Sequence, residues 1–309
     1  MNAITLLDGG MGQELLRRSS RPATRLWSAD VMLNEPMLVR DLHRDFIHSG
    51  ARVITLNSYT ATPMRLAREN QLAQLTGLHN SAMRAAIDAI EMAQCDGVRI
   101  AGCLPPLVAS YQPEVFLTYA ESLDSYRRLV ELQFSASDVF LCETMASITE
   151  ATAACAAGIE SGKPVWVGLT VSDTNFGQLR SGEPLSDAVA ALISLGAQAI
   201  LLNCSQPEAI SACWSELCNA TNNVVNNLTI EPSCKIGAYA NGFVSIASLH
   251  PGVTVDVLET RQDLNPQQYA NHAMQWAESG ASILGGCCEI SPAHIKVLHA
   301  RLCKEGFIV

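Results

Sequence analysis

Three cysteines that follow short apolar runs are the residues best suited to carry chemistry. Cys204 follows Leu201-Leu202-Asn203, and Cys287 and Cys288 follow Ile283-Leu284-Gly285-Gly286. Adjacent cysteines on a regular strand would point to opposite faces, but the two glycines permit a bend that could aim both sulfurs at one centre. Three thiolates can hold a tetrahedral Zn²⁺ ion and leave its fourth position open. The pattern predicts a zinc site that takes part in a reaction.

Other interpretations of the cysteines are possible from the sequence. Two adjacent buried thiols can simply pack as small hydrophobic side chains. Redox catalysis is disfavoured because a C-x-x-C motif is absent and a disulfide between adjacent residues would be strained. The eleven cysteines are odd in number and scattered among apolar segments, which is typical of reduced thiols. A third cysteine at an equivalent strand end favours zinc for Cys204, Cys287 and Cys288.

Two carboxylates occupy similar positions at the ends of apolar runs. Asp8 lies before Gly9 and Gly10, where a strand gives way to a helix, and Glu143 ends a later strand. Backbone N–H groups after Asp8 could hold a carboxylate, although Asp8 could equally cap the helix at a tight turn. Asp8 and Glu143 together could bind an ammonium group. An amino acid, with one charge of each sign, would fit both features.

Two aromatic residues could face a cation. Trp27 and Tyr59 could contribute about 0.5–2 kcal/mol each through their ring faces, although such residues also pack in ordinary cores. The seven histidines share no metal-ligand spacing with the cysteines. We expect the histidines to be structural or solvated.

Short β-rich runs alternate with longer stretches of helical period, which is typical of repeated βα units around a parallel sheet. Each strand candidate is continuously apolar, as strands buried on both faces are. The predicted strands are Ile4–Leu7, Arg52–Asn57, Val98–Cys103, Asp138–Cys142, Val165–Thr170, Gln198–Asn203, Lys235–Ala240 and Ser282–Gly286. The predicted helices are Pro36–His48, Pro63–Gln94, Pro113–Ser137, Ser147–Ser161, Leu185–Leu195, Pro207–Asn219, Pro266–Ser279 and Pro292–Cys303.

Eight strands that each precede a helix predict an α/β fold, a (β/α)8 TIM barrel, as a single domain over residues 1–309. An open doubly wound sheet is disfavoured because no Gly-rich dinucleotide turn is present. The stretches 222–234 and 242–265 lack a clear period and are expected to be loops. Barrel enzymes place catalytic groups at the C-terminal ends of their strands. The predicted ligands and carboxylates all fall at that end.

Composition excludes several classes of function. No apolar run approaches the roughly 20 residues that span a bilayer, and the N-terminus has no secretory signal pattern, so we expect a cytoplasmic protein without membrane contact. The net charge of −10 and the lack of an Arg/Lys cluster disfavour nucleic acid. An acidic field weakly favours a cationic substrate.

Six motifs taken together carry a family resemblance: Leu6-Leu7-Asp8-Gly9-Gly10-Met11, Leu26-Trp27-Ser28-Ala29, Tyr59-Thr60-Ala61-Thr62-Pro63, Cys142-Glu143-Thr144, Asn203-Cys204 and Gly285-Gly286-Cys287-Cys288. The chain resembles the homocysteine S-methyltransferases, in particular members that use S-methylmethionine or S-adenosylmethionine. Betaine-dependent enzymes and the homocysteine domain of cobalamin-dependent methionine synthase are more distant relatives. The resemblance covers nearly the whole chain.

The resemblance implies a zinc-containing (β/α)8 barrel that methylates the thiol of L-homocysteine to form methionine. Carried onto this sequence, it implies Zn²⁺ bound by Cys204, Cys287 and Cys288. It also implies that Asp8 and Glu143 hold the amino group of homocysteine.

Further contacts follow from the same resemblance. Backbone amides at Gly9 and Gly10 would lie beside the bound amino acid, and Trp27 and Tyr59 would correspond to aromatics of a pocket for a small cationic donor. The segment Ala101–Pro106 departs from the family because it has Cys103 where relatives often have serine, and it lacks their Gly-Pro-Tyr continuation. The identity of the methyl donor therefore stays open.

Three alternatives remain at this level. The chain could methylate another thiol or selenol, or use a betaine-like donor. It could be a barrel lyase or hydrolase in which Asp8 and Glu143 act as acid and base. It could also be a non-enzymatic protein that binds zinc or an amino acid. The sequence leaves the oligomeric state open.

Overall fold

The computed structural model describes residues 3–22, 24–114, 117–228, 234–250, 253 and 257–309. Eight strands form its centre, and they match the eight predicted ones to within a few residues at each end. They are β1 (Thr5–Leu6), β2 (Val53–Thr55), β3 (Arg99–Leu104), β4 (Val139–Met145), β5 (Val165–Leu169), β6 (Ala199–Asn203), β7 (Lys235–Tyr239) and β8 (Ile283–Leu284).

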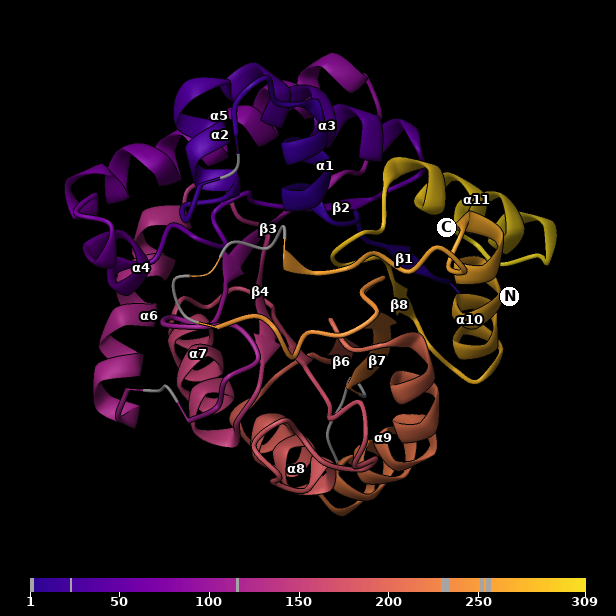
Figure 1. Cartoon of the computed structure of the whole chain (residues 1–309). Helices are drawn as coiled ribbons and strands as arrows, with labels where there is room; N and C mark the ends of the chain where they lie inside the picture. The colour runs from indigo at the N-terminus through magenta and orange to yellow at the C-terminus, as the bar shows by residue number, and fades with distance from the viewer. Residues whose placement is uncertain (1–2, 23, 115–116, 229–233, 251–252, 254–256) are drawn as a thin grey trace.

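The strands form one parallel sheet that curls into a barrel (Figure 1). Their order is β1-β8-β7-β6-β5-β4-β3-β2. The seam between β1 and β2 is closed by a parallel bridge between Leu7 and Val53, where the N–H of Asp8 donates to the Val53 carbonyl at 3.0 Å. The N–H of Arg52 donates to the Leu6 carbonyl at 2.8 Å on the same seam. The predicted (β/α)8 barrel and single-domain fold are confirmed.

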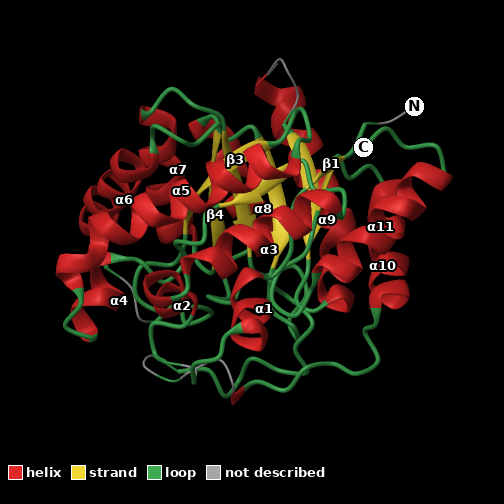
Figure 2. Ribbon diagram, turned by 90° about the horizontal axis from the view of Figure 1, so that it is seen from above, coloured by secondary structure: helices red, strands yellow, loops and turns green. Residues whose placement is uncertain are grey.

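Helices cover the outside of the barrel (Figure 2). They are α1 (Met11–Arg18), α2 (Ser28–Asn34), α3 (Pro36–His48), α4 (Pro63–Arg68), α5 (Leu75–Ala93), α6 (Tyr119–Gln133), α7 (Ile148–Glu160), α8 (Leu185–Leu195), α9 (Pro207–Leu228), α10 (Pro266–Glu278) and α11 (Pro292–Lys304), with a 3₁₀ turn at Leu72–Gln74. None of these helices combines the length and apolar character needed to cross a membrane.

Successive side chains along each strand point to opposite faces of the sheet and so form two apolar layers. In β6, Ala199 and Leu201 face the barrel interior, while Ile200 and Leu202 pack outward against the helices. Both sets are buried, which explains why the strands read as continuous apolar runs. The rigid double-layered sheet fixes the strand ends on which the candidate site is built.

Several helix boundaries differ from the predictions for local reasons. The expected helix Pro63–Gln94 is divided because Asn70 adopts a left-handed backbone (φ 56°). The helix expected from Pro113 begins only at Tyr119, where Thr118 and Glu121 form a capping box. The expected loop at 222–234 is wrong over 222–228, because α9 continues through Leu228; residues 229–233 lie outside the described residues. Helix α2 was not among the predicted ones, whereas α1 is the helix expected to begin after Asp8, for which no bounds were predicted.

Candidate functional site

One pocket at the C-terminal end of the barrel gathers every residue proposed from the sequence. All the residues predicted to bind metal or substrate line it, namely Asp8, Gly9, Gly10, Trp27, Tyr59, Glu143, Cys204, Cys287 and Cys288. They come from segments far apart in the chain that the barrel strands and the loops after them bring together. Their individual roles stay predictions.

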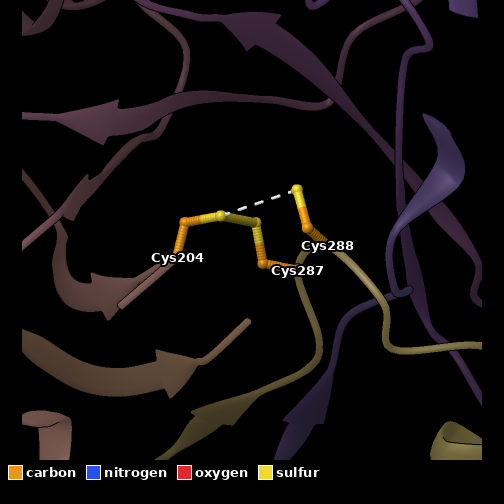
Figure 3. Close-up of side chains that lie close together, drawn as sticks. All are labelled: Cys204, Cys287 and Cys288. Carbon is orange, nitrogen blue, oxygen red and sulfur yellow. Dashed lines mark hydrogen bonds between the residues drawn. A yellow bond between two sulfur atoms is a disulfide. The ribbon is translucent and has the colours of Figure 1, made fainter. Parts of the chain in front are cut away.

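The three cysteines lie where β6 and β8 end. The ladder continues past the strands, since the N–H of Cys204 donates to the Tyr239 carbonyl at 3.1 Å and that of Cys287 to the Ala240 carbonyl at 2.9 Å. The three sulfurs all lie within 4.8 Å of one another, and the sulfurs of Cys204 and Cys288 are 3.8 Å apart (Figure 3). The backbone thus sets the sulfurs at one level of the rim.

Cys204 and Cys287 form a disulfide in this structure, while the other nine cysteines are free. This differs from the expectation that all eleven thiols are reduced. The reason is geometric: the two Cα atoms are 5.5 Å apart, a separation that suits a disulfide as well as a shared metal ion. Metal binding by all three sulfurs therefore requires this pair to be reduced.

The donor set fits a zinc ion once the pair is reduced. Metal–sulfur bonds of about 2.3 Å in a tetrahedron place the sulfurs about 3.8 Å apart, which is the separation between Cys204 and Cys288. Thiolates are ligands that zinc prefers. Three protein ligands leave one position for an exogenous thiol.

Four non-glycine residues that line the pocket have left-handed backbones: Trp27 (φ 52°), Tyr111 (φ 64°), Thr144 (φ 59°) and Cys204 (φ 49°). Such conformations cost on the order of 1 kcal/mol or more each, and they cluster at functional sites. Surrounding contacts must hold these residues in place. The concentration of strained backbone in one pocket supports its role as the functional site.

A β-bulge turns Glu143 toward the pocket. The register between β4 and β5 shifts between Cys142 and Met145, and bulges of this kind re-aim side chains. The Asn203 side chain fixes the bulge, because its Oδ1 accepts from the N–H of Thr144 at 3.0 Å and its Nδ2 donates to Oγ1 of Thr144 at 3.1 Å. No individual role was predicted for Asn203 beyond its place next to Cys204.

Asp8 and Glu143 form a pair of buried acidic groups. Asp8 is 4% exposed and accepts from the N–H of Thr55 at 2.8 Å. Burial raises the pKa of Asp8 to about 8 despite that hydrogen bond, and the Glu143 carboxylate adds to the rise. Burial also raises the pKa of Glu143, which is partly accessible from the pocket, to about 7. A cation bound between the two groups would stabilise their charged forms.

Cys103 is a hydrogen-bond partner of Glu143. Its thiol donates to Oε2 of Glu143 at 3.2 Å, and burial together with that carboxylate holds the pKa of Cys103 well above its usual value. Cys103 is therefore a neutral hydrogen-bond donor. The cysteine that departs from the family pattern therefore lies in direct contact with Glu143, one of the two acidic groups.

The turn after β1 packs tightly against the cysteine segment. A Cβ on Gly10 would lie 2.5 Å from the carbonyl oxygen of Cys287, so only glycine allows this approach. The N–H of Gly10 donates to the Ile290 carbonyl at 2.8 Å, while Gly10 itself lines the pocket, and its predicted place beside the substrate stays a prediction. Gly10 occupies the N-cap of α1, so Asp8 does not cap the helix. Met11 and Gly12, in the first turn of α1, line the pocket.

Aromatic side chains also line the pocket. The rings of Trp27 and Tyr59 meet edge to face, with centroids 6.2 Å apart. Two tyrosines were missed from the sequence: Tyr111 has its hydroxyl 3.0 Å from the sulfur of Cys204, and Tyr239 ends β7. The buried hydroxyl of Tyr239 has no hydrogen-bond partner within the described part of the chain. Tyr239 could have been identified from its position at a predicted strand end. Tyr111 lies in a loop and could not be identified in that way.

Comparison with known proteins assigns the chain that forms this pocket to a family. The family model described as homocysteine S-methyltransferase matches residues 5–302. The chain belongs to the homocysteine S-methyltransferase family. The match confirms the family resemblance and identifies the chain as an enzyme of the methyltransferase class. The lyase, hydrolase and non-enzymatic alternatives therefore no longer apply.

Relatives of the homocysteine S-methyltransferase family match over almost their whole length. The Escherichia coli (strain K12) homocysteine S-methyltransferase is 30% identical, with 96% of this chain and 95% of the relative covered. A selenocysteine Se-methyltransferase of Brassica oleracea var. italica is 26% identical, with 96% and 88% covered. The structure of the metallated form of the homocysteine methyltransferase MmuM from Escherichia coli has a TM-score of 0.78 at 27% identity, with 96% of both chains covered.

Replacement of Asp8 by asparagine is expected to stabilise the substrate-free enzyme at alkaline pH. The pKa of Asp8 is higher in the folded chain, at about 8, than the usual value near 3.9. The folded state therefore binds more protons between these values, so the contribution of Asp8 to stability is lost progressively as pH rises from about 4 and is fully lost above about 8. Asp8→Asn should unfold at higher urea than wild type at pH 8.5. Its gain in free energy of unfolding should be larger at pH 8.5 than at pH 5 by up to about 4 kcal/mol, because about three pH units separate pH 5 from the folded pKa.

The control for this measurement is Asp96→Asn, at an exposed turn after α5. Its stability should follow wild type at both pH values. An Asp8→Asn gain that is equal at pH 5 and 8.5 would contradict the assignment of a raised pKa to Asp8.

Proposed function

We propose that the chain transfers a methyl group from a sulfonium donor, S-methylmethionine or S-adenosylmethionine, to the thiol of L-homocysteine to form methionine. The observation that carries the proposal is the single pocket that combines three clustered sulfurs, two carboxylates and an aromatic pair. Membership of the homocysteine S-methyltransferase family supports it.

Asp8 and Glu143 would bind the ammonium group of homocysteine. A bound ammonium compensates the cost of ionising two buried carboxyl groups, so both would be charged in the complex. The first turn of α1, at Met11 and Gly12, offers backbone N–H groups and a positive dipole end to the carboxylate of homocysteine. These contacts direct the thiol toward the cysteine cluster.

Cys204, Cys287 and Cys288 would hold Zn²⁺ in the reduced enzyme. A free thiol with a pKa near 8.5 is only a few per cent thiolate at pH 7, and the thiolate is the nucleophile. A coordinating zinc ion supplies deprotonation of the substrate thiol at neutral pH.

Trp27 and Tyr59 would bind the donor cation through their rings and hold its methyl group toward the homocysteine sulfur. The bond from the donor sulfur to methyl breaks while the bond from methyl to the homocysteine sulfur forms. The donor sulfur keeps the electron pair and leaves as a neutral thioether. No general base is needed after the thiol proton has left.

The test is methionine formation by reduced enzyme with homocysteine and a panel of S-methylmethionine, S-adenosylmethionine and betaine, with and without a zinc chelator. We expect turnover with a sulfonium donor and its loss on chelation. No methionine with any donor would contradict the proposal. Selenocysteine is a second acceptor to include, because of the Brassica Se-methyltransferase relative.

A further inference from the structure

The pocket that contains Cys204, Cys287 and Cys288 is here called the cysteine pocket. A second pocket of opposite charge adjoins it. The two share Trp27, Tyr59, Ser110 and Leu249 as lining residues. Among the described lining residues, the cysteine pocket has two carboxylates and no arginine or lysine. The second pocket, here called the arginine pocket, has three arginines and one carboxylate, Glu69. This local excess of positive charge is found in a chain of net charge −10.

Arg65 in α4 is fixed at the boundary between the two pockets. Its guanidinium lies 5.5 Å from the centre of the Tyr59 ring. Its Nη2 donates to the Pro106 carbonyl at 3.1 Å and to Oγ of Ser110 at 3.2 Å, and its Nε donates to the same carbonyl at 3.3 Å. The Ser110 hydroxyl also lies 2.9 Å from the Tyr59 hydroxyl. Neutral oxygens thus orient the cation, and the charge of Glu150 acts on it only from beyond ion-pair distance.

The arginine pocket therefore has cations that are available to an anionic ligand. Within the residues that the structure describes, no carboxylate lies within 4.0 Å of Arg65 or Arg68 to form an ion pair. Arg65 is only partly exposed, whereas Arg68 is exposed and donates to the Val108 carbonyl at 3.1 Å. A half-buried guanidinium without a carboxylate partner is suited to bind a carboxylate from a ligand.

We propose that the arginine pocket binds the carboxylate of the methyl donor, with Arg65 as the main contact and Arg68 as the second. This inference rests on the proposed function and specifies its substrate class: an α-amino-acid sulfonium, not a simple sulfonium cation. The sulfonium would lie at Trp27 and Tyr59, next to the anionic cysteine pocket. Glu69 is the matching acceptor for the donor's ammonium group.

A purely structural role for Arg65 makes a different prediction. If Arg65 only orients Tyr59 and the segment 106–110, its replacement weakens the binding of every donor to the same extent. If Arg65 binds the carboxylate, its replacement weakens only donors that carry one. A donor and its carboxamide, which differ in that charge alone, separate the two roles.

The test is calorimetric binding of S-methylmethionine and its carboxamide to the reduced, zinc-loaded enzyme. Wild type should bind the acid about 10–100-fold more tightly, as expected for a charge-assisted hydrogen bond. Arg65→Gln should reduce this preference to about 3-fold or less, and Arg65→Lys should retain part of it. Arg84→Gln, at an exposed position of α5, should behave as wild type.

Several results would overturn the inference: equal binding of acid and carboxamide by wild type, no binding of either, or a preference that survives in Arg65→Gln. A loss of homocysteine affinity in place of donor affinity would assign the arginine pocket to the acceptor and also overturn it. Methionine formation is measured separately. A charge preference that depends on Arg65 in an enzyme that forms no methionine would sustain the arginine pocket and contradict the proposed function.

Discussion

Replacement of Cys288 by serine is expected to remove bound zinc and to lower kcat/KM for methionine formation by about 10³-fold. Loss of substrate deprotonation costs about 30-fold at pH 7 for a thiol with a pKa near 8.5, and loss of the fixed position of the sulfur costs the remainder. Cys288 is a better position for the substitution than Cys204 or Cys287, because it does not take part in the disulfide between those two residues. Zinc per chain and initial rates, measured on fully reduced protein, check the expectation.

The matched control is Cys303→Ser. Cys303 is an exposed free thiol on α11 and does not line the pocket. It should keep stoichiometric zinc and wild-type activity. If Cys288→Ser also keeps both, the three sulfurs do not form the metal site, and the mechanism proposed above is wrong.

The second large effect is expected for Glu143→Gln, which should raise KM for homocysteine by about 10–100-fold. The amide keeps the size of the side chain but removes the charge that pairs with an ammonium group, a hydrogen bond worth about 1.5–3 kcal/mol. The KM for the donor should change little. Initial rates over a matrix of both substrate concentrations measure the two constants.

An acceptor without an amino group provides the control for Glu143. With 4-mercaptobutyrate in place of homocysteine, wild type and Glu143→Gln should have similar KM values, because neither makes the ammonium contact. Glu131→Gln, at an exposed position of α6, should leave both acceptors unaffected. An equal loss with both acceptors would show that Glu143 acts on pocket structure and not on the amino group.

The pH dependence of Glu143→Gln follows from the same contact. Burial raises the pKa of Glu143 to about 7, and only its deprotonated form attracts the ammonium group. The wild-type kcat/KM for homocysteine should therefore rise as pH increases through about 7. The Glu143→Gln profile should lack this contribution, and an unchanged profile would assign the rise to another group.

Local patterns along the chain were enough to predict the barrel and the end of the barrel at which the site lies. Apolar runs long enough for a strand and too short for a helix alternate with helical stretches, and this local pattern predicts each strand without knowledge of its neighbours. Parallel strands in a barrel all end at the same rim. Asp8, Glu143, Cys204 and the pair at 287–288 could be placed together for that reason, and the structure confirms that they share one pocket.

Tertiary structure alone decided how these groups face one another. The bulge that directs Glu143 depends on Asn203 from a different strand, and the pairing of Cys204 with Cys287 depends on two strand ends brought close by barrel closure. Tyr111 and Arg65 come from a loop and a short helix between strands. Both positions result from long-range packing, and that of Tyr111 also from a left-handed backbone that local preference opposes. Periodicity in the sequence carries no information on such contacts, so the charge of the second pocket became visible only in the folded chain.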